Sequence, residues 1–150
     1  MIFYIIVFTV LIAFVVAKLE IEIEGKNGWA ENLPTWRIKN RITKLFWGEQ
    51  PYTGYHFWFL MMIIVMSHFP IVLGLDWSWS KELVVWAIFL IASVLEDFFW
   101  FILNPHYGIK KFNPIHAPWH DKWIWKFPLL YVRLLGTSAI LLTGSYFLSA

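Results

Sequence analysis

The chain has 150 residues, of which 59% are hydrophobic and 15% are charged, and its formal net charge is +2. A soluble domain has roughly 45–50% apolar and about 25% charged residues, so this composition predicts an integral membrane protein. The small net charge argues against a nucleic-acid partner. Because the chain has no cysteine, disulfides, thiol nucleophiles and cysteine-ligated metals are excluded as well.

Four apolar blocks are each close to the ~17–25 residues that a helix needs to cross the hydrocarbon core of a bilayer. They lie at about residues 1–17, 55–75, 82–103 and 127–148. The first block lacks the basic residues that precede the apolar core of a signal peptide, so we expect it to be a retained span. The pattern predicts a single all-α membrane domain over residues 1–150, with four transmembrane helices.

The basic residues are concentrated between the apolar blocks. Residues 18–54 contain six Lys or Arg side chains and residues 104–126 contain four, out of twelve in the chain. By the positive-inside rule, both long loops are expected on the cytoplasmic side of the membrane and both termini outside. We expect the membrane to be a prokaryotic cytoplasmic membrane, with the functional loops facing the cytoplasm.

The first long loop contains two patterned segments. Residues 19–25 alternate between apolar and acidic side chains, which predicts a short strand, although Glu20 and Glu24 could equally share one face of a helix that continues the first span. Residues 32–48 mix aromatic and aliphatic side chains with Arg and Lys, and Pro34 suits a first helical turn. This second segment predicts a basic amphipathic helix on the inner leaflet.

Two adjacent acids, Glu96 and Asp97, lie inside the third apolar block. A carboxylate at such a depth costs several kcal/mol unless it is neutral, paired or metal-bound. Neighbouring helical residues differ by about 100°, so the two acids are expected to face different neighbours. One alternative is a structural ion pair with Arg133, which lies at a similar depth in the fourth block.

The other alternative is a metal site built with histidine. Four of the five histidines lie in or beside the two long loops: His56, His106, His116 and His120. The i, i+4 spacing of His116 and His120 would place both rings on one face of a helix, as in half of many metal sites. We expect Glu96, His116 and His120 to be ligands, with His56 and His106 as further candidates. Nitrogen and oxygen donors favour zinc or iron.

These residues predict a metal-dependent membrane enzyme with its site at the cytoplasmic interface, in which Asp97 and Asp121 are the expected catalytic carboxylates. Zinc would support hydrolysis, and iron would support oxygen-dependent chemistry. The expected partners are membrane lipids and a lipid or other hydrophobic substrate, and a homo-oligomer is compatible with the pattern. Two alternatives are a small transporter or channel component that uses these residues as an ion or proton path, and a structural subunit held by Arg133 pairing.

Overall fold

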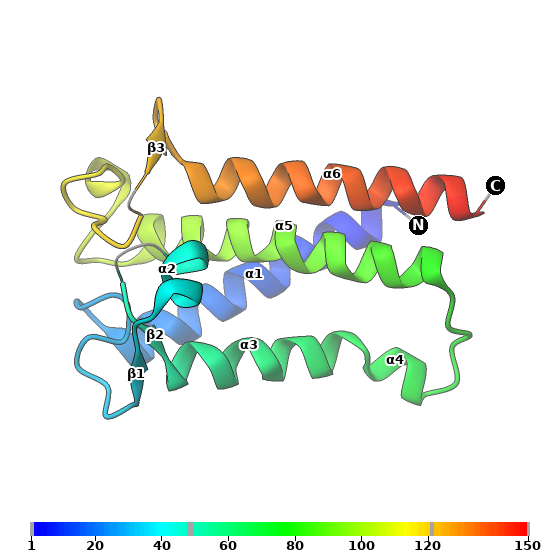
Figure 1. The fold of residues 1–150 in the computed structure, drawn as a ribbon, viewed down its shortest axis with the longest axis horizontal. Helices are drawn as coiled ribbons and strands as arrows, with labels where there is room; N and C mark the ends of the chain where they lie inside the picture. Colours follow the sequence, from blue (N-terminus) through cyan, green and yellow to red (C-terminus); the bar gives the residue numbers. More distant parts are fainter. Residues whose placement is uncertain (1, 48–49, 121, 150) are drawn as a thin grey trace.

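The computed structural model describes residues 2–47, 50–120 and 122–149. The described chain is mostly helical and contains three long apolar helices: α1 (Ile2–Glu24), α5 (Trp79–Leu103) and α6 (Leu129–Ser149). Each of the three is long and apolar enough to cross a membrane, which indicates an integral membrane protein. The helices run along the long axis of the molecule (Figure 1).

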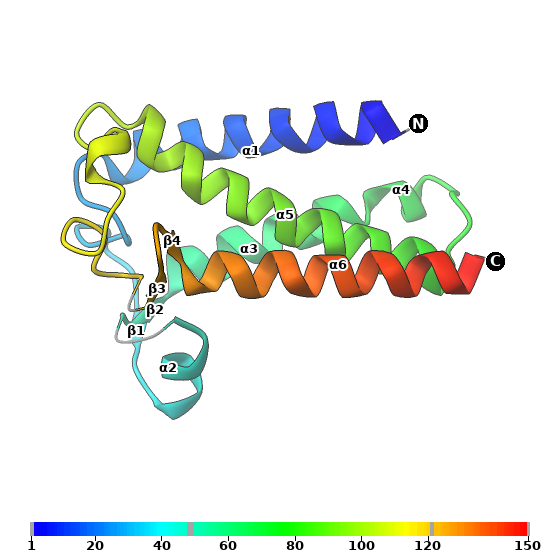
Figure 2. The ribbon, with the colours of Figure 1, turned by 90° about the horizontal axis from the view of Figure 1, so that it is seen from above.

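Helix α5 lies between α1 and α6 and packs against both (Figure 2). On α1, Ala13 and Ala17 are fully buried, and such small side chains let helix backbones approach closely in a membrane. At the far end of α5 from the long loops, Ser80 Oγ donates to the Ser145 carbonyl at 3.0 Å, and Ser145 Oγ donates to the Ser80 carbonyl at 2.9 Å. These reciprocal hydrogen bonds join α5 to α6.

The second predicted span corresponds to two consecutive helices, α3 (Gly54–Ser67) and α4 (Phe69–Val72). They lie along the same axis as the long helices (Figure 1). The 14 residues of α3 rise only about 21 Å, which is less than the ~30 Å thickness of the hydrocarbon core. The helix is interrupted at His68, because Pro70 has no N–H group with which to continue the hydrogen bonding of α3.

Both long loops lie at one end of the bundle, and Ile2 and Ser149 lie at the opposite end (Figure 1). The loops contain two small antiparallel sheets, a short α-helix and one turn of 3-10 helix. These elements are β1 (Arg37–Ile38) with β2 (Tyr52–Thr53), β3 (Trp123–Ile124) with β4 (Phe127–Pro128), α2 (Arg41–Trp47) and η1 (Ile109–Lys111).

Of the two alternatives for residues 19–25, the helix that continues the first span is confirmed and the strand is wrong, because α1 extends to Glu24. The helix predicted over residues 32–48 is also shorter than expected and begins only at Arg41. The cause is Arg37, whose guanidinium donates to the carbonyls of Thr35 at 2.9 Å and Glu31 at 3.0 Å. These bonds hold the chain around Pro34 in a compact turn that leads into β1.

The second long loop folds onto the end of α5 through aromatic packing. Phe101 is fully buried and stacks on Trp119, with the ring centroids 5.5 Å apart. Trp100, Tyr107 and Phe112 pack around the same centre. Because these rings lie at the end of α5, the loop is fixed directly over the residues that form the candidate site.

Candidate functional site

A cavity of about 330 Å³ lies among α1, α3, α5 and α6 at the loop end of the bundle. Its polar wall is made of four carboxyl groups, two imidazoles and a phenol: Glu20, Glu24, Glu96, Asp97, His56, His120 and Tyr131. Its other walls are apolar and come from positions further from the loops, among them Ile12, Ile63, Leu90 and Leu134. We call this cavity the acidic pocket.

Asp97 receives hydrogen bonds from two other elements. Its Oδ2 accepts from His120 Nε2 at 3.0 Å and from the hydroxyl of Tyr131 on α6. The His120 side chain is 4% exposed, whereas that of Asp97 is 29% exposed. The folded second loop therefore places the buried imidazole of His120 against the carboxyl group of Asp97, which still faces the acidic pocket.

Glu96 faces α1 instead. Its carboxyl group lies beside that of Glu20 on the pocket wall, and two such groups can form a hydrogen bond when one of them carries a proton. Tyr55 donates its hydroxyl to Glu20 Oε1 at 3.3 Å. Glu96 Oε1 is buried and has no hydrogen-bond partner within the described part of the chain.

Glu24 fixes the turn that follows α1. Its Oε1 accepts from the Ala30 backbone N–H at 2.6 Å, and both Trp29 and Ala30 have positive φ angles, 59° and 51°. This backbone conformation is costly for residues other than glycine, so the carboxylate stabilises a turn that would otherwise be unfavourable. The turn places Trp29 against the acidic pocket.

His56 is held beside Trp29 at the start of α3. Its Nδ1 is 2.7 Å from Thr53 Oγ1, and its ring lies 4.5 Å from that of Trp29, centroid to centroid. Trp29 is anchored in turn by donating Nε1 to the Pro51 carbonyl at 2.8 Å. The N-cap of α3 and the turn after α1 thus set the position of this imidazole on the pocket wall.

The structure brings together four of the residues proposed from the sequence: Glu96, Asp97, His56 and His120. His116 and His106 are exposed outside the pocket. The expected helix over 116–120 is replaced by turns, because Asn113 Oδ1 accepts from the backbone N–H groups of Ile115 at 3.0 Å and His116 at 3.3 Å. The two histidines therefore do not share a helical face.

The expected ion pair with Arg133 is not present. Arg133 is exposed on α6, and within the described part of the chain it forms no ion pair with Glu96 or Asp97. The proposed catalytic residue Asp121 lies outside the described residues. Among the described residues, no group of three or more His, Asp or Glu side chains is arranged so that it could hold a metal ion.

Sequence reasoning did not assign Glu20, Glu24, Tyr55 or Tyr131 to the site. Glu20 and Glu24 have i, i+4 spacing directly after an apolar run, and a helix that continued past residue 17 would have placed both on one face. Tyr55 and Tyr131 carried no comparable signal, because each reaches its acid from a different helix.

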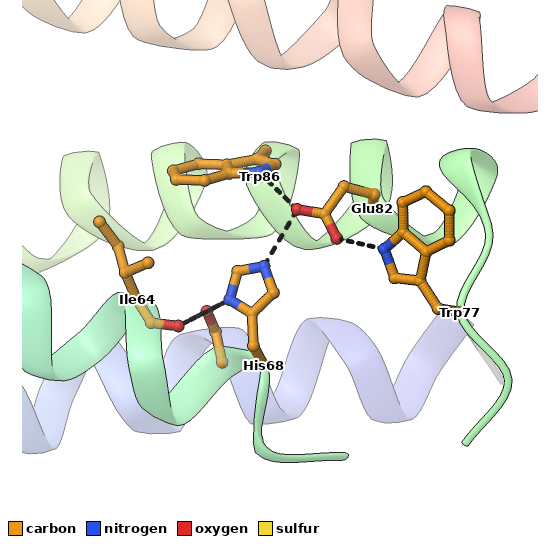
Figure 3. A network of polar contacts seen from close by, with 6 residues as sticks. Ile64, His68, Trp77, Glu82 and Trp86 are labelled. Atoms are coloured by element: carbon orange, nitrogen blue, oxygen red, sulfur yellow. Dashed lines mark hydrogen bonds and ion pairs between the residues drawn. The ribbon is translucent and has the colours of Figure 1, made fainter. Parts of the chain in front are cut away.

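A second polar cluster lies at the opposite end of the bundle (Figure 3). His68 Nδ1 is 2.7 Å from the Ile64 carbonyl, and Nε2 is 3.0 Å from Glu82 Oε1. Glu82 also accepts from Trp77 Nε1 at 3.0 Å and Trp86 Nε1 at 2.8 Å. Since both ring nitrogens of His68 face acceptors, the geometry fits an imidazolium that ties the break between α3 and α4 to α5.

Comparison of the chain with protein-family models, curated proteins and solved structures found no match. The chemistry of the acidic pocket is therefore the basis for a functional proposal. It combines an apolar chamber with carboxyl, imidazole and phenol groups drawn from four helices and the second long loop. Concave, mostly apolar sites with a few converging polar groups are typical of small-molecule binding.

Proposed function

We propose that this chain is a membrane enzyme that binds a hydrophobic molecule in the acidic pocket and acts on it by proton transfer. The observation that carries the proposal is the continuity of the pocket, in which Glu96, Asp97 and His120 open onto the same cavity as the apolar side chains of the bundle. The volume of about 330 Å³ lies within the roughly 300–1,000 Å³ that is typical of ligand sites.

The apolar walls support a hydrophobic substrate. Side chains such as Ile12 and Leu90 line the part of the pocket that lies furthest from the loops, where they would bury the hydrocarbon part of a ligand. Each Å² of apolar surface removed from water contributes about 25 cal/mol. A substrate with a long apolar portion would therefore gain most of its binding free energy there and place its polar end among the carboxyl groups.

The polar wall supports acid–base chemistry. In the proposed reaction, the neighbouring carboxyl groups of Glu20 and Glu96 donate a proton, and Asp97, oriented by His120 and Tyr131, accepts one. A donor and an acceptor that face one cavity allow a proton to be added at one atom of a substrate and removed at another. Such a reaction involves no net oxidation or reduction.

The membrane arrangement belongs to the same proposal. We infer that α3 and α4 together form a fourth membrane segment and that α2 lies on the inner leaflet, with both termini outside. The position of ten of the twelve Lys and Arg residues in the two long loops supports a cytoplasmic location for the loop end. The acidic pocket would then lie near the cytoplasmic interface.

Zinc or iron stays a prediction of the sequence. Three of the five expected ligands, Glu96, His56 and His120, line the acidic pocket, whereas His106 and His116 are exposed elsewhere. Elemental analysis of the purified protein tests this prediction directly. If the protein contains stoichiometric metal, and the metal is lost in His120→Ala but kept in His116→Ala, the metal site lies in the acidic pocket.

The proposed reaction is tested by comparing the hydrophobic compounds in membranes that contain different variants. Membranes with the natural chain, with Asp97→Asn and with His116→Ala are extracted, and lipids and other hydrophobic metabolites are compared by mass spectrometry. We expect the natural chain and His116→Ala, whose ring is exposed outside the pocket, to produce the same change in composition, which Asp97→Asn abolishes. Identical profiles for all three chains at equal protein levels would contradict the proposal.

A further inference from the structure

We propose that the acidic pocket selects hydrophobic molecules whose polar end is positively charged, as in a protonated amine. This inference rests on the proposed function, because it concerns the same pocket, and it names the class of substrate. It follows from the charge on the pocket wall, from a buried carboxyl oxygen without a partner, and from the aromatic rings beside it.

The pocket wall is rich in acidic groups. Four carboxyl groups line it, and none of the described residues on the wall is Lys or Arg. Of the described groups on the wall, His56 and His120 are the two that could carry a positive charge, so the acids outnumber them by two. In a low-dielectric cavity, a cationic ligand would be attracted and an anionic one repelled.

A buried polar atom points to a missing hydrogen-bond partner. Glu96 Oε1 is buried and unpaired within the described part of the chain, and Glu96 lines the acidic pocket. A buried acceptor without a partner is unfavourable, and more so when it is charged. The N–H groups of an ammonium ligand would satisfy the Glu96 oxygen.

Aromatic rings surround the same end of the pocket. Trp29, Trp100 and Trp119 all line it, and the face of an indole attracts a cation most strongly among the aromatic side chains. Gly28 allows two of these rings to approach, because a Cβ atom at this position would lie 3.1 Å from Trp100 Cη2 and 3.0 Å from Trp119 Cη2. Carboxyl groups and aromatic rings together are suited to an ammonium group and unsuited to a phosphate or a carboxylate.

The test uses three probes that share a twelve-carbon chain and differ in the charge of the polar end: dodecylamine, 1-dodecanol and dodecanoate. Their binding to the full chain in lipid nanodiscs is measured at pH 7 by isothermal titration, with empty nanodiscs as the reference for partitioning. We expect dodecylamine to bind about tenfold more tightly than the alcohol, the equivalent of one charged hydrogen bond, and dodecanoate to bind most weakly.

Three variants show whether the acids cause this preference. Glu24→Gln removes one acidic group, and the new side chain can still accept a hydrogen bond from the Ala30 N–H, so the turn is kept. Glu96→Gln removes the acidic group beside α1. We expect Glu24→Gln and Glu96→Gln each to reduce the advantage of the amine over the alcohol by about three- to tenfold while leaving the affinity for the alcohol nearly unchanged. Glu22→Gln is the matched control, because Glu22 is an exposed acid on the same helix as Glu24, and it should change neither value.

The outcomes separate this inference from the proposed function. Equal binding of amine and alcohol, or an amine advantage that survives both Glu24→Gln and Glu96→Gln, would overturn the charge preference and leave a pocket for neutral molecules. If none of the three probes binds beyond the empty-nanodisc reference, the pocket does not hold hydrophobic molecules, and the proposed function fails as well. If a variant does not fold, the ranking of the three probes on the natural chain still decides the inference.

Discussion

Removal of the His120 side chain tests whether the loop at residues 104–126 is held in place by its contact with α5. His120 Nε2 lies 3.0 Å from Asp97 Oδ2, and the ring also packs against Trp123 and Tyr131 at 5.8 and 5.7 Å between centroids. His120→Ala would therefore remove a hydrogen bond to a carboxylate and leave a small cavity among aromatic rings. Both effects destabilise the folded state.

The expected loss follows from the exposure of the two partners. A hydrogen bond to a charged group contributes about 1.5–3 kcal/mol, and breaking a fully buried ion pair costs about 3–5 kcal/mol. Here Asp97 is 29% exposed and keeps its bond from Tyr131, so the cost should stay below the upper end of the range for a buried ion pair. We expect His120→Ala to lower the free energy of unfolding by about 2–4 kcal/mol.

The assay is unfolding in mixed detergent micelles, followed by circular dichroism, for His120→Ala, Asp97→Ala and the double variant. The double-mutant cycle isolates the contact itself, for which we expect a coupling of about 1–2 kcal/mol. His116→Ala is the matched control, because His116 is exposed and its ring contacts Asn113 within the same loop; its effect should stay within about 0.5 kcal/mol. A coupling near zero, or equal losses for His116→Ala and His120→Ala, would refute this reasoning.

Three further changes test the packing of the bundle. Phe101→Ala should cost about 3–5 kcal/mol in unfolding free energy, because Phe101 is fully buried, whereas Phe147→Ala, at a side chain that is 72% exposed, should cost little. Ser145→Ala removes the hydrogen bonds of its hydroxyl with Ser80 and should cost about 1 kcal/mol in the same assay; no loss would show that these bonds do not stabilise the α5–α6 contact. His68→Ala removes the link between the α3–α4 break and α5 and should cost about 1–3 kcal/mol. It should also speed hydrogen exchange at the backbone N–H groups of α4, and unchanged exchange would contradict this.

The long helices were predictable because they depend on local properties. Apolar runs at 82–103 and 127–148 correspond to α5 and α6, and the run at 1–17 corresponds to the first part of α1. Length and hydropathy are properties of each segment alone. The break at residue 68 was harder to predict, because a proline shortly after a helix is compatible with either a kink or an end.

The loop structures could not be predicted because they depend on contacts between distant segments. Arg37 holds the turn around Pro34 through four carbonyls, which a helical pattern does not reveal. In the second loop, the spacing of His116 and His120 suggested a helix, but Asn113 forms a turn instead. The pairing of His116 with His120 as metal ligands was expected from that helix, and the turn removes the shared helical face.

The two acids of α5 are held by different neighbours, as the 100° between adjacent helical residues predicts. Glu96 contacts Glu20 on α1, while Asp97 contacts Tyr131 on α6 and His120 in the loop. Neither arrangement is an efficient way to stabilise a membrane bundle, because buried charged groups are often replaced by apolar residues at no loss of stability. The proposed ligand would account for four carboxyl groups around one cavity, because it would bring proton donors or positive charge to the acids and hydrocarbon to the apolar walls.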